Sequence, residues 1–289
     1  MNETGVISEV FPKMANVILD SDESRKVLCP YRRGQIVDRD AEWRERSPVA
    51  PGDRVKIRIF GSKDGVIEEV FPRTNSISRK APGREGKIMH TIAANIDFVV
   101  ITSSLHQPEF SAGLIDRFLI STMAAEITPL LVINKMDLAS GDERPWKLYE
   151  DLGYRCFPVS TRDRTGIEAL KTTLAGKTSV FCGHSGVGKT SLLSELFGEV
   201  VGKTGEVSGA TGKGKHTTTV SKLIPTGGGT RFIDTPGIKE FGLIGIEPKQ
   251  LIQYFPELYE IQLRHEDYTT LPRYESYLRI KAALEDEGR

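Results

Sequence analysis

A glycine-rich stretch that ends in a lysine and a hydroxyl residue is the part of this sequence best suited to chemistry. Residues 183–190 read GHSGVGKT, after a β-rich run and before a helical one. Glycines let the backbone wrap phosphate groups, with N–H groups pointing inward and the positive end of the next helix behind them. This pattern predicts that Lys189 reaches the β- and γ-phosphates and that Thr190 places its hydroxyl on Mg²⁺.

A second motif, Asn134-Lys135-Met136-Asp137, follows the apolar run Leu130–Ile133. Loops at the ends of such strands bind ligands in open α/β sheets. The motif resembles the Asn-Lys-x-Asp motif of GTPases, whose aspartate accepts two hydrogen bonds from the N1 and N2 donors of guanine. Adenine lacks this donor pair, so Asp137 predicts a preference for GTP over ATP. A helix-capping loop is the alternative interpretation of these four residues.

Two further motifs follow strand-like runs. Asp234-Thr235-Pro236-Gly237 matches Asp-x-x-Gly, in which the aspartate holds Mg²⁺ through water and the glycine N–H contacts the γ-phosphate. A plain turn would also use Pro-Gly. Ser160-Thr161-Arg162 resembles, more loosely, the Ser-Ala-Lys motif that supports guanine binding.

The loop of residues 209–219 is glycine-rich, basic and ends in three threonines. Such a loop can become ordered when a threonine ligates Mg²⁺ and touches the γ-phosphate. By analogy with related GTPases we expect Thr218 to be that ligand, with Thr217 as the rival. A flexible loop without a ligand role is the alternative.

The predicted site therefore draws on four motifs and this loop. The nucleotide-binding residues are Asn134, Lys135, Asp137, Ser160, Thr161, Gly183, Ser185, Gly186, Val187, Gly188, Lys189, Thr190, Ser191, Asp234 and Gly237. Thr190, Thr218 and Asp234 are the predicted magnesium set. In ordinary GTPases the phosphate loop comes first and the guanine motif late, whereas here the guanine motif precedes it, so the sequence predicts a circular permutation.

The elements that must position these motifs fall into distinct regions. Short β-branched runs between turns in residues 1–72 predict a small barrel, of which an OB-type barrel is one form. A basic linker follows in residues 73–90, and strands alternating with helices in residues 91–243 predict a mostly parallel α/β sheet. Residues 244–289 have a helical pattern and form the last predicted domain.

The composition excludes several protein classes. Lys plus Arg and Asp plus Glu both number 39 in 289 residues, so only local basic stretches could attract nucleic acid. Three widely separated cysteines do not form a disulfide framework, and no run of about 18 apolar residues marks a membrane span. These features predict a soluble cytoplasmic protein that does not enter a membrane.

Together these motifs resemble the ribosome small-subunit-dependent GTPase family, RsgA or YjeQ. The resemblance extends to Pro51-Gly52-Asp53, the linker Ser76–Lys80 and the tail Arg273–Tyr277. It implies an OB barrel, a permuted P-loop GTPase domain and a monomer acting late in maturation of the small (30S) ribosomal subunit. GTP-bound protein would dock on the subunit and its 16S rRNA, and hydrolysis stimulated by the subunit would release it in the GDP state.

The chain departs from the family pattern at the zinc site. The family places three cysteines and one histidine before the Arg-Tyr-x-Ser-Tyr tail, but residues 241–271 contain no cysteine and only His265. One imidazole cannot build a closed four-ligand site. We therefore expect no zinc, His265 at the surface, and an apolar substitute made by Leu258, Ile261 and Leu263.

The catalytic assignment depends on a missing side chain. Many GTPases orient water with a glutamine after the Asp-x-x-Gly glycine, but here that position is Ile238. Slow intrinsic hydrolysis is therefore expected. His216 adjoins the threonines of the loop of residues 209–219, the switch loop, and the family resemblance implies a catalytic histidine there. The predicted catalytic residues are His216, Lys189 and Thr218. His216 could instead contact RNA or solvent.

Two other functions stay open on this evidence. An RNA-binding switch protein with incidental GTP hydrolysis is one, and an ATP-dependent small-molecule kinase, disfavoured by Asp137, is the other. The candidate phosphate contacts for RNA are basic residues of the barrel, linker and switch loop: Arg32, Arg33, Arg73, Arg79, Lys80, Lys213 and Lys215.

Overall fold

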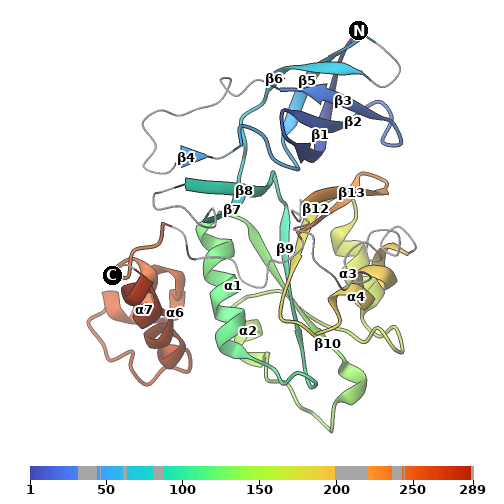
Figure 1. The fold of residues 1–289 in the computed structure, drawn as a ribbon. Helices are drawn as coiled ribbons and strands as arrows, with labels where there is room; N and C mark the ends of the chain where they lie inside the picture. Colours follow the sequence, from blue (N-terminus) through green and yellow to red (C-terminus); the bar gives the residue numbers. More distant parts are fainter. Residues whose placement is uncertain are drawn as a thin grey trace, which may run out of the picture. The chain divides into compact units, whose positions relative to one another are not determined.

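A computed structural model provides the structure of the protein. It describes residues 1–31, 44–45, 47–60, 64–80, 88–198, 221–235, 243 and 245–287. The chain groups into two compact units, each assembled from three stretches of sequence. Figure 1 labels the helices and strands from which the two units are built. The first unit comprises Met1–Phe98, Ala169–Phe181 and Thr190–Ile238; the second comprises Val99–Glu168, Cys182–Lys189 and Lys239–Arg289.

The first unit begins with the predicted barrel. Its strands are β1 (Asn2–Phe11), β2 (Met14–Leu19), β3 (Lys26–Pro30), β5 (Arg54–Ile59) and β6 (Gly65–Val70). They pair in the order β3-β2-β1-β5-β6, and a parallel bridge between Leu28 and Asp64 links the two ends. This order closes the five strands into a small barrel. Alternate residues fill the interior, among them Ile7, Val17 and Ile57, so the period-2 pattern predicted this part correctly.

A small second sheet follows the barrel. Strands β4 (Arg44–Glu45), β8 (Ile88–Ala94) and β7 (Ser76–Lys80) lie in that order, with β7 at an edge and antiparallel to β8. The segment predicted as a basic linker thus contributes strands of its own. The domain boundaries expected from the sequence stay a prediction.

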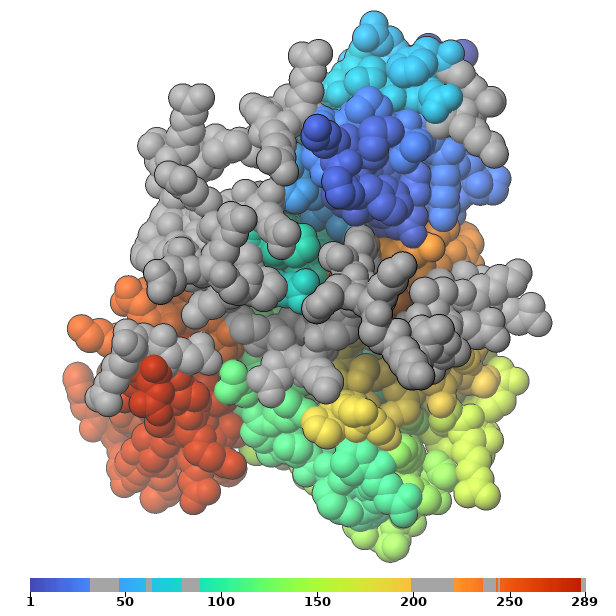
Figure 2. Space-filling view, viewed as in Figure 1, coloured from blue at the N-terminus to red at the C-terminus, as the bar shows by residue number. Residues whose placement is uncertain are grey.

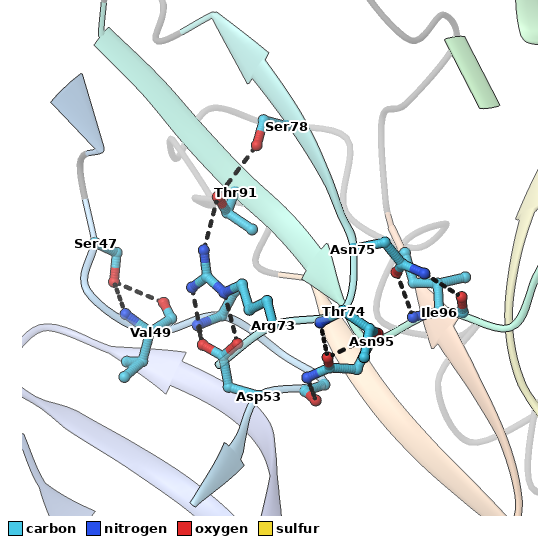
Figure 3. A network of polar contacts seen from close by, with 12 residues as sticks. Ser47, Val49, Asp53, Arg73, Thr74, Asn75, Ser78, Thr91, Asn95 and Ile96 are labelled. Atoms are coloured by element: carbon cyan, nitrogen blue, oxygen red, sulfur yellow. Dashed lines mark hydrogen bonds and ion pairs between the residues drawn. The ribbon is translucent and has the colours of Figure 1, made fainter. Parts of the chain in front are cut away.

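A buried ion pair ties this sheet to the barrel (Figure 3). Arg73 donates from Nε and Nη2 to the two carboxylate oxygens of Asp53, at 2.7 and 2.9 Å, and Asp53 is fully buried. Asn95 donates to the carbonyl of Gly52 at 2.9 Å and accepts from the backbone N–H of Thr74. Because its guanidinium is engaged by Asp53 and only 20% of its side chain is exposed, Arg73 is a poor candidate for an RNA phosphate contact.

The rest of the first unit continues the sheet beyond the barrel. It contains most of β12 (Thr178–Cys182), with β13 (Lys222–Gly227), β14 (Thr230–Asp234) and most of α3 (Ile167–Leu174) and α4 (Lys189–Phe197). The strand order is β12-β14-β13-β1-β2-β3, so a barrel strand pairs directly with β13. Helix α4 covers this sheet through Phe197, whose ring stacks on Phe232 at 5.1 Å between centroids.

The second unit holds the other strands of α/β type. They are β9 (Phe98–Ser104), β10 (Thr128–Asn134) and β11 (Cys156–Pro158), in the order β11-β10-β9, and β10 runs parallel to β11. The helical elements are α1 (Ala112–Ala124), which packs on β10, the short η1 (Met136–Leu138) and α2 (Lys147–Asp151). The alternation of strand and helix expected from the sequence is confirmed.

The end of the chain is a helical module within the second unit. It consists of η2 (Leu251–Tyr254), α6 (Pro256–Leu263) and α7 (Tyr274–Glu287), and it forms the orange and red patch of Figure 2. Phe255 and Leu258 are fully buried in its core, which also takes in Ile120 of α1. Leu258 lies where we expected, but the prediction for Leu263 is wrong, because 62% of its surface is exposed.

Candidate nucleotide-binding site

The glycine-rich loop connects β12 to α4, as the sequence predicted. Gly183, Gly186 and Gly188 have φ angles of +140°, +85° and +88°, which side chains rarely adopt. A Cβ atom on Gly183 would lie 2.0 Å from the carbonyl oxygen of Thr102, and one on Gly188 would lie 2.4 Å from Nδ2 of Asn134. Glycine is therefore required at both positions for the loop to pass so close to its neighbours.

Lys189 curls over this loop. Its Nζ donates to the carbonyl oxygens of Gly183 at 2.6 Å and His184 at 2.8 Å. Burial lowers the pKa of the Lys189 ammonium, and the interaction with Cys182 offsets this only in part. A phosphate group would supply the missing negative charge, so the ammonium is held where an anion stabilises it.

The Asn134-Lys135 segment is bonded to the same loop. Asn134, at the end of β10, is 1% exposed and donates from Nδ2 to the carbonyl of Val187 at 3.0 Å. Lys135 Nζ donates to the carbonyl of Gly186 at 2.7 Å. These bonds join two loops that lie about 50 positions apart in the sequence. Direct contacts thus fix the spacing of the two loops that are predicted to bind the base and the phosphates.

Ser160 orients the carboxylate of Asp137. The buried Ser160 hydroxyl donates to Oδ1 of Asp137 at 2.9 Å and accepts from the backbone N–H of Arg162 at 3.2 Å. The guanidinium of Arg162 lies 3.7 Å from Oδ2 of Asp137. The Ser160-Thr161-Arg162 segment therefore contacts the Asn-Lys-x-Asp motif through Asp137. Thr161 itself is half-buried.

The predicted magnesium residues within the described ranges lie in the first unit. Thr190 lies in the first turn of α4, next to the predicted nucleotide-binding residue Ser191, and Asp234 is the last residue of β14. Burial raises the pKa of Asp234, partly offset by the positive charge of Lys222. A hydroxyl and an undercompensated carboxylate are oxygen donors of the kind that Mg²⁺ prefers. Thr218, His216 and Gly237 lie outside the described residues.

Comparison with known proteins places this arrangement in one family. Residues 70–244 match the model of the RsgA GTPase family. The chain belongs to this family. It is 38% identical over 247 residues to small ribosomal subunit biogenesis GTPase RsgA 2 of Bacteroides thetaiotaomicron, covering 84% of this chain and 79% of that protein. It is 37% identical to RsgA of Chlorobaculum parvum over 268 residues, covering 89% and 84%.

Solved structures agree with the fold. YjeQ from Thermotoga maritima matches over the full length of both chains, with a TM-score of 0.72 and 27% identity. YloQ, a circularly permuted GTPase, matches with a TM-score of 0.70 over 99% of this chain and 96% of that one. At 23% identity the second match concerns the fold alone. The family and the permuted P-loop fold expected from the sequence are confirmed.

The residues of this RsgA-family chain do not fit a zinc site in the helical module. The sequence has no cysteine after Cys182. Within the described ranges no three His, Cys, Asp or Glu side chains are grouped so that they could hold a metal ion. His265 is exposed on the surface, as expected.

The sequence did not reveal how the helical module is attached to α1. Arg273, which precedes α7, is 2% exposed and donates from Nε to Oδ1 of Asp116 at 2.9 Å. It also pairs with Glu257 at 3.1 Å and lies 4.6 Å from the ring centre of Phe255. Burial opposes the positive charge of Arg273, but the two carboxylates outweigh it and raise its pKa.

Proposed function

We propose that this protein binds and hydrolyses GTP with Mg²⁺ and acts in biogenesis of the small ribosomal subunit. One observation carries the nucleotide assignment: Ser160 orients Asp137 while Asn134 is bonded to the phosphate loop. An oriented carboxylate at that place matches the paired N1 and N2 donors of guanine. The relatives' names supply the process, because both curated relatives are named as small ribosomal subunit biogenesis GTPases.

The roles of the residues follow from their chemistry. Lys189 leaves its carbonyl partners for the β- and γ-phosphates, and the amide groups of the glycine loop surround those oxygens. Thr190, Thr218 and Asp234 hold Mg²⁺, with Asp234 acting through water. Bound Mg²⁺ neutralises charge on the β- and γ-phosphates. His216 is proposed to orient the attacking water, since the position after Gly237 carries no glutamine.

Partners are proposed on the same basis. The OB barrel and the basic residues around it would contact 16S rRNA on the 30S subunit, and the protein would act as a monomer in the cytoplasm. The helical module, residues 244–289, would dock without zinc. None of the helices in the described ranges is both long and apolar enough to cross a bilayer.

A second candidate is an RNA-binding switch that uses GTP for its conformational change, with hydrolysis incidental. Ile238 favours it, because an alkyl group at that position can neither accept from nor donate to water. The two proposals differ in whether small subunits accelerate hydrolysis.

The test is multiple-turnover hydrolysis of GTP and ATP with and without purified small subunits. Small subunits are expected to stimulate GTP turnover; a rate unchanged by saturating subunits would favour the switch. His216→Ala should abolish the stimulated rate while leaving GTP affinity unchanged. Full stimulated turnover in that variant would remove His216 from catalysis.

Base recognition is tested separately with Asp137→Asn. The amide loses the match to guanine but can donate to the C2 carbonyl of xanthine, so preference should move from GTP to xanthosine triphosphate. Asp142→Asn, at an exposed site nearby, is the matched control and should keep GTP preference. Unchanged GTP selectivity in Asp137→Asn would contradict the assignment of the base-binding loop.

A further inference from the structure

Three charged residues form a row across three neighbouring strands of the first unit. Glu9 of the barrel strand β1 is in register with Lys222 of β13, and Lys222 is in register with Asp234 of β14. Residues directly opposite each other in antiparallel strands share a face, with Cβ atoms about 5 Å apart. The row therefore runs negative, positive, negative from the barrel to the predicted magnesium residue.

The barrel end of the row is firmly held. Lys222 Nζ lies 2.8 Å from Oε1 of Glu9, and Asn16 of β2 donates to Oε2 of Glu9 at 2.8 Å. The Glu9 side chain is 19% exposed. Burial would raise its pKa, but the bonds from Lys222 and Asn16 outweigh it and lower the pKa. Glu9 is thus a fixed anion that belongs to the barrel.

At the other end of the row, within the part of the chain that the structure describes, Asp234 has no ion pair like that of Glu9. Asp234 ends β14, and burial is the main influence on its carboxyl group, with the charge of Lys222 acting against it. A carboxylate in this situation gains from any added cation. Lys222 and Mg²⁺ therefore compete for the negative charge of Asp234. The ion pair with Glu9 limits how closely the Lys222 ammonium approaches Asp234.

We propose that Glu9, from the barrel, is a positioning residue that holds the Lys222 ammonium away from the magnesium site, where Lys222 would otherwise compete with Mg²⁺ for Asp234. This inference rests on the proposed function, because it requires Asp234 to face Mg²⁺. With Glu9 in place, Lys222 is engaged by the barrel and Asp234 is open to hydrated Mg²⁺. Without Glu9, Lys222 turns to Asp234 and opposes the metal.

The linkage works in both directions. Mg²⁺ near Asp234 repels the ammonium towards Glu9, so metal and nucleotide binding strengthens the contact between β13 and β1. Coupling between two sites is reciprocal by thermodynamic necessity. The row thereby connects the nucleotide state to the barrel that is proposed to bind RNA.

The experiment measures GTP affinity by fluorescence titration as a function of Mg²⁺ concentration, in the full-length protein. Glu9→Gln is expected to raise about fivefold the Mg²⁺ concentration at which GTP affinity is half-way to its maximum. Fivefold is the low end of the coupling factors found between linked sites. Lys222→Met removes the competitor, so it should lower that concentration or leave it unchanged. The double variant should show the same Mg²⁺ dependence as Lys222→Met. Lys222→Arg keeps the positive charge and should keep the Mg²⁺ dependence of the wild type.

Lys171→Met is the matched control, because it removes a lysine charge from an exposed position on α3 of the same unit. It should leave the Mg²⁺ dependence unchanged. A second readout is hydrogen exchange of the β1 amides in nucleotide-bound protein with and without Mg²⁺. Mg²⁺ should slow this exchange in the wild type but not in Glu9→Gln.

The outcomes separate the two proposals. If the wild type binds no guanine nucleotide at any Mg²⁺ concentration, the proposed function fails. If it binds GTP with Mg²⁺ but Glu9→Gln matches Lys171→Met, the positioning role is overturned. Equal losses in Glu9→Gln and Lys222→Met would also overturn it, since a purely structural pair gives shifts of one sign. If Lys222→Met does not fold, the Glu9→Gln titration and exchange decide alone.

Discussion

Replacing Arg273 by methionine should detach the helical module from α1. Methionine keeps much of the side-chain length but leaves Asp116, whose side chain is 1% exposed, as a buried carboxylate without its cation. Removing one partner of a buried pair costs about 3–5 kcal/mol. The guanidinium over the ring of Phe255, at 4.6 Å, adds up to about 2 kcal/mol when desolvated. We expect the loss to fall near the upper part of the first range.

The assay combines urea unfolding with native-state hydrogen exchange of residues 245–287. Exchange is needed because the chain has two compact units and a single transition need not report on the module. Arg273→Met should speed exchange in α6 and α7, and Arg273→Lys should restore it only in part, since an ammonium lacks the planar fork. Arg279→Met, on the exposed side of α7, is the control.

Two further measurements test whether the Arg273–Asp116 pair holds the module. Asp116→Asn combined with Arg273→Met removes both charges and should recover a large part of the loss. A zinc chelator should leave exchange unchanged, because the module has no cysteine ligands. If Arg273→Met stays within about 1 kcal/mol of Arg279→Met, a range expected for surface positions, the buried pair does not hold the module.

Two other predictions concern the loop and the pH dependence of stability. Gly183→Ala should cost about 1–3 kcal/mol of folding free energy and weaken GTP binding, because its Cβ would meet the Thr102 carbonyl at 2.0 Å. Gly198→Ala, where no described atom lies within 4 Å, should leave GTP affinity unchanged; equal affinities for the two variants would contradict the steric argument. Burial raises the pKa of Glu257 above its usual value of 4.5, which means that the folded protein favours the protonated carboxyl group. The resulting stabilisation is fully present below pH 4.5 and is lost as the pH rises through the raised pKa. Glu257→Gln should flatten this part of a melting-temperature profile against pH, and an unchanged slope would contradict it.

Local patterns predicted the elements that depend on neighbours in sequence. The helical run expected after the glycine-rich loop is α4 (Lys189–Phe197), and the loop itself has the positive φ angles that its glycines allow. These features follow from backbone sterics and hydrophobic periodicity, which a short window contains. The same holds for the strands that carry Asn134 and Asp234 at their ends.

Contacts between distant segments could not be predicted in this way. Asp116 and Arg273 are 157 positions apart, and each alone has the composition of a solvated surface residue. Likewise, no local signal in Glu9 or Lys222 indicates that β1 pairs with β13. Leu263 shows the opposite error, because an apolar residue in a helical pattern proved to face solvent. Such positions are settled by packing between segments, which one sequence does not display.

The pairing of β1 with β13 also bears on attempts to trim the protein. A fragment that begins after the barrel would leave one side of β13 with unsatisfied backbone N–H and C=O groups, a template for intermolecular strand addition. Shortened versions intended for crystallography or nucleotide assays should therefore self-associate unless proline or charged residues are introduced into β13, which would then be an edge strand. In this architecture the amino-terminal barrel protects the solubility of the domain behind it.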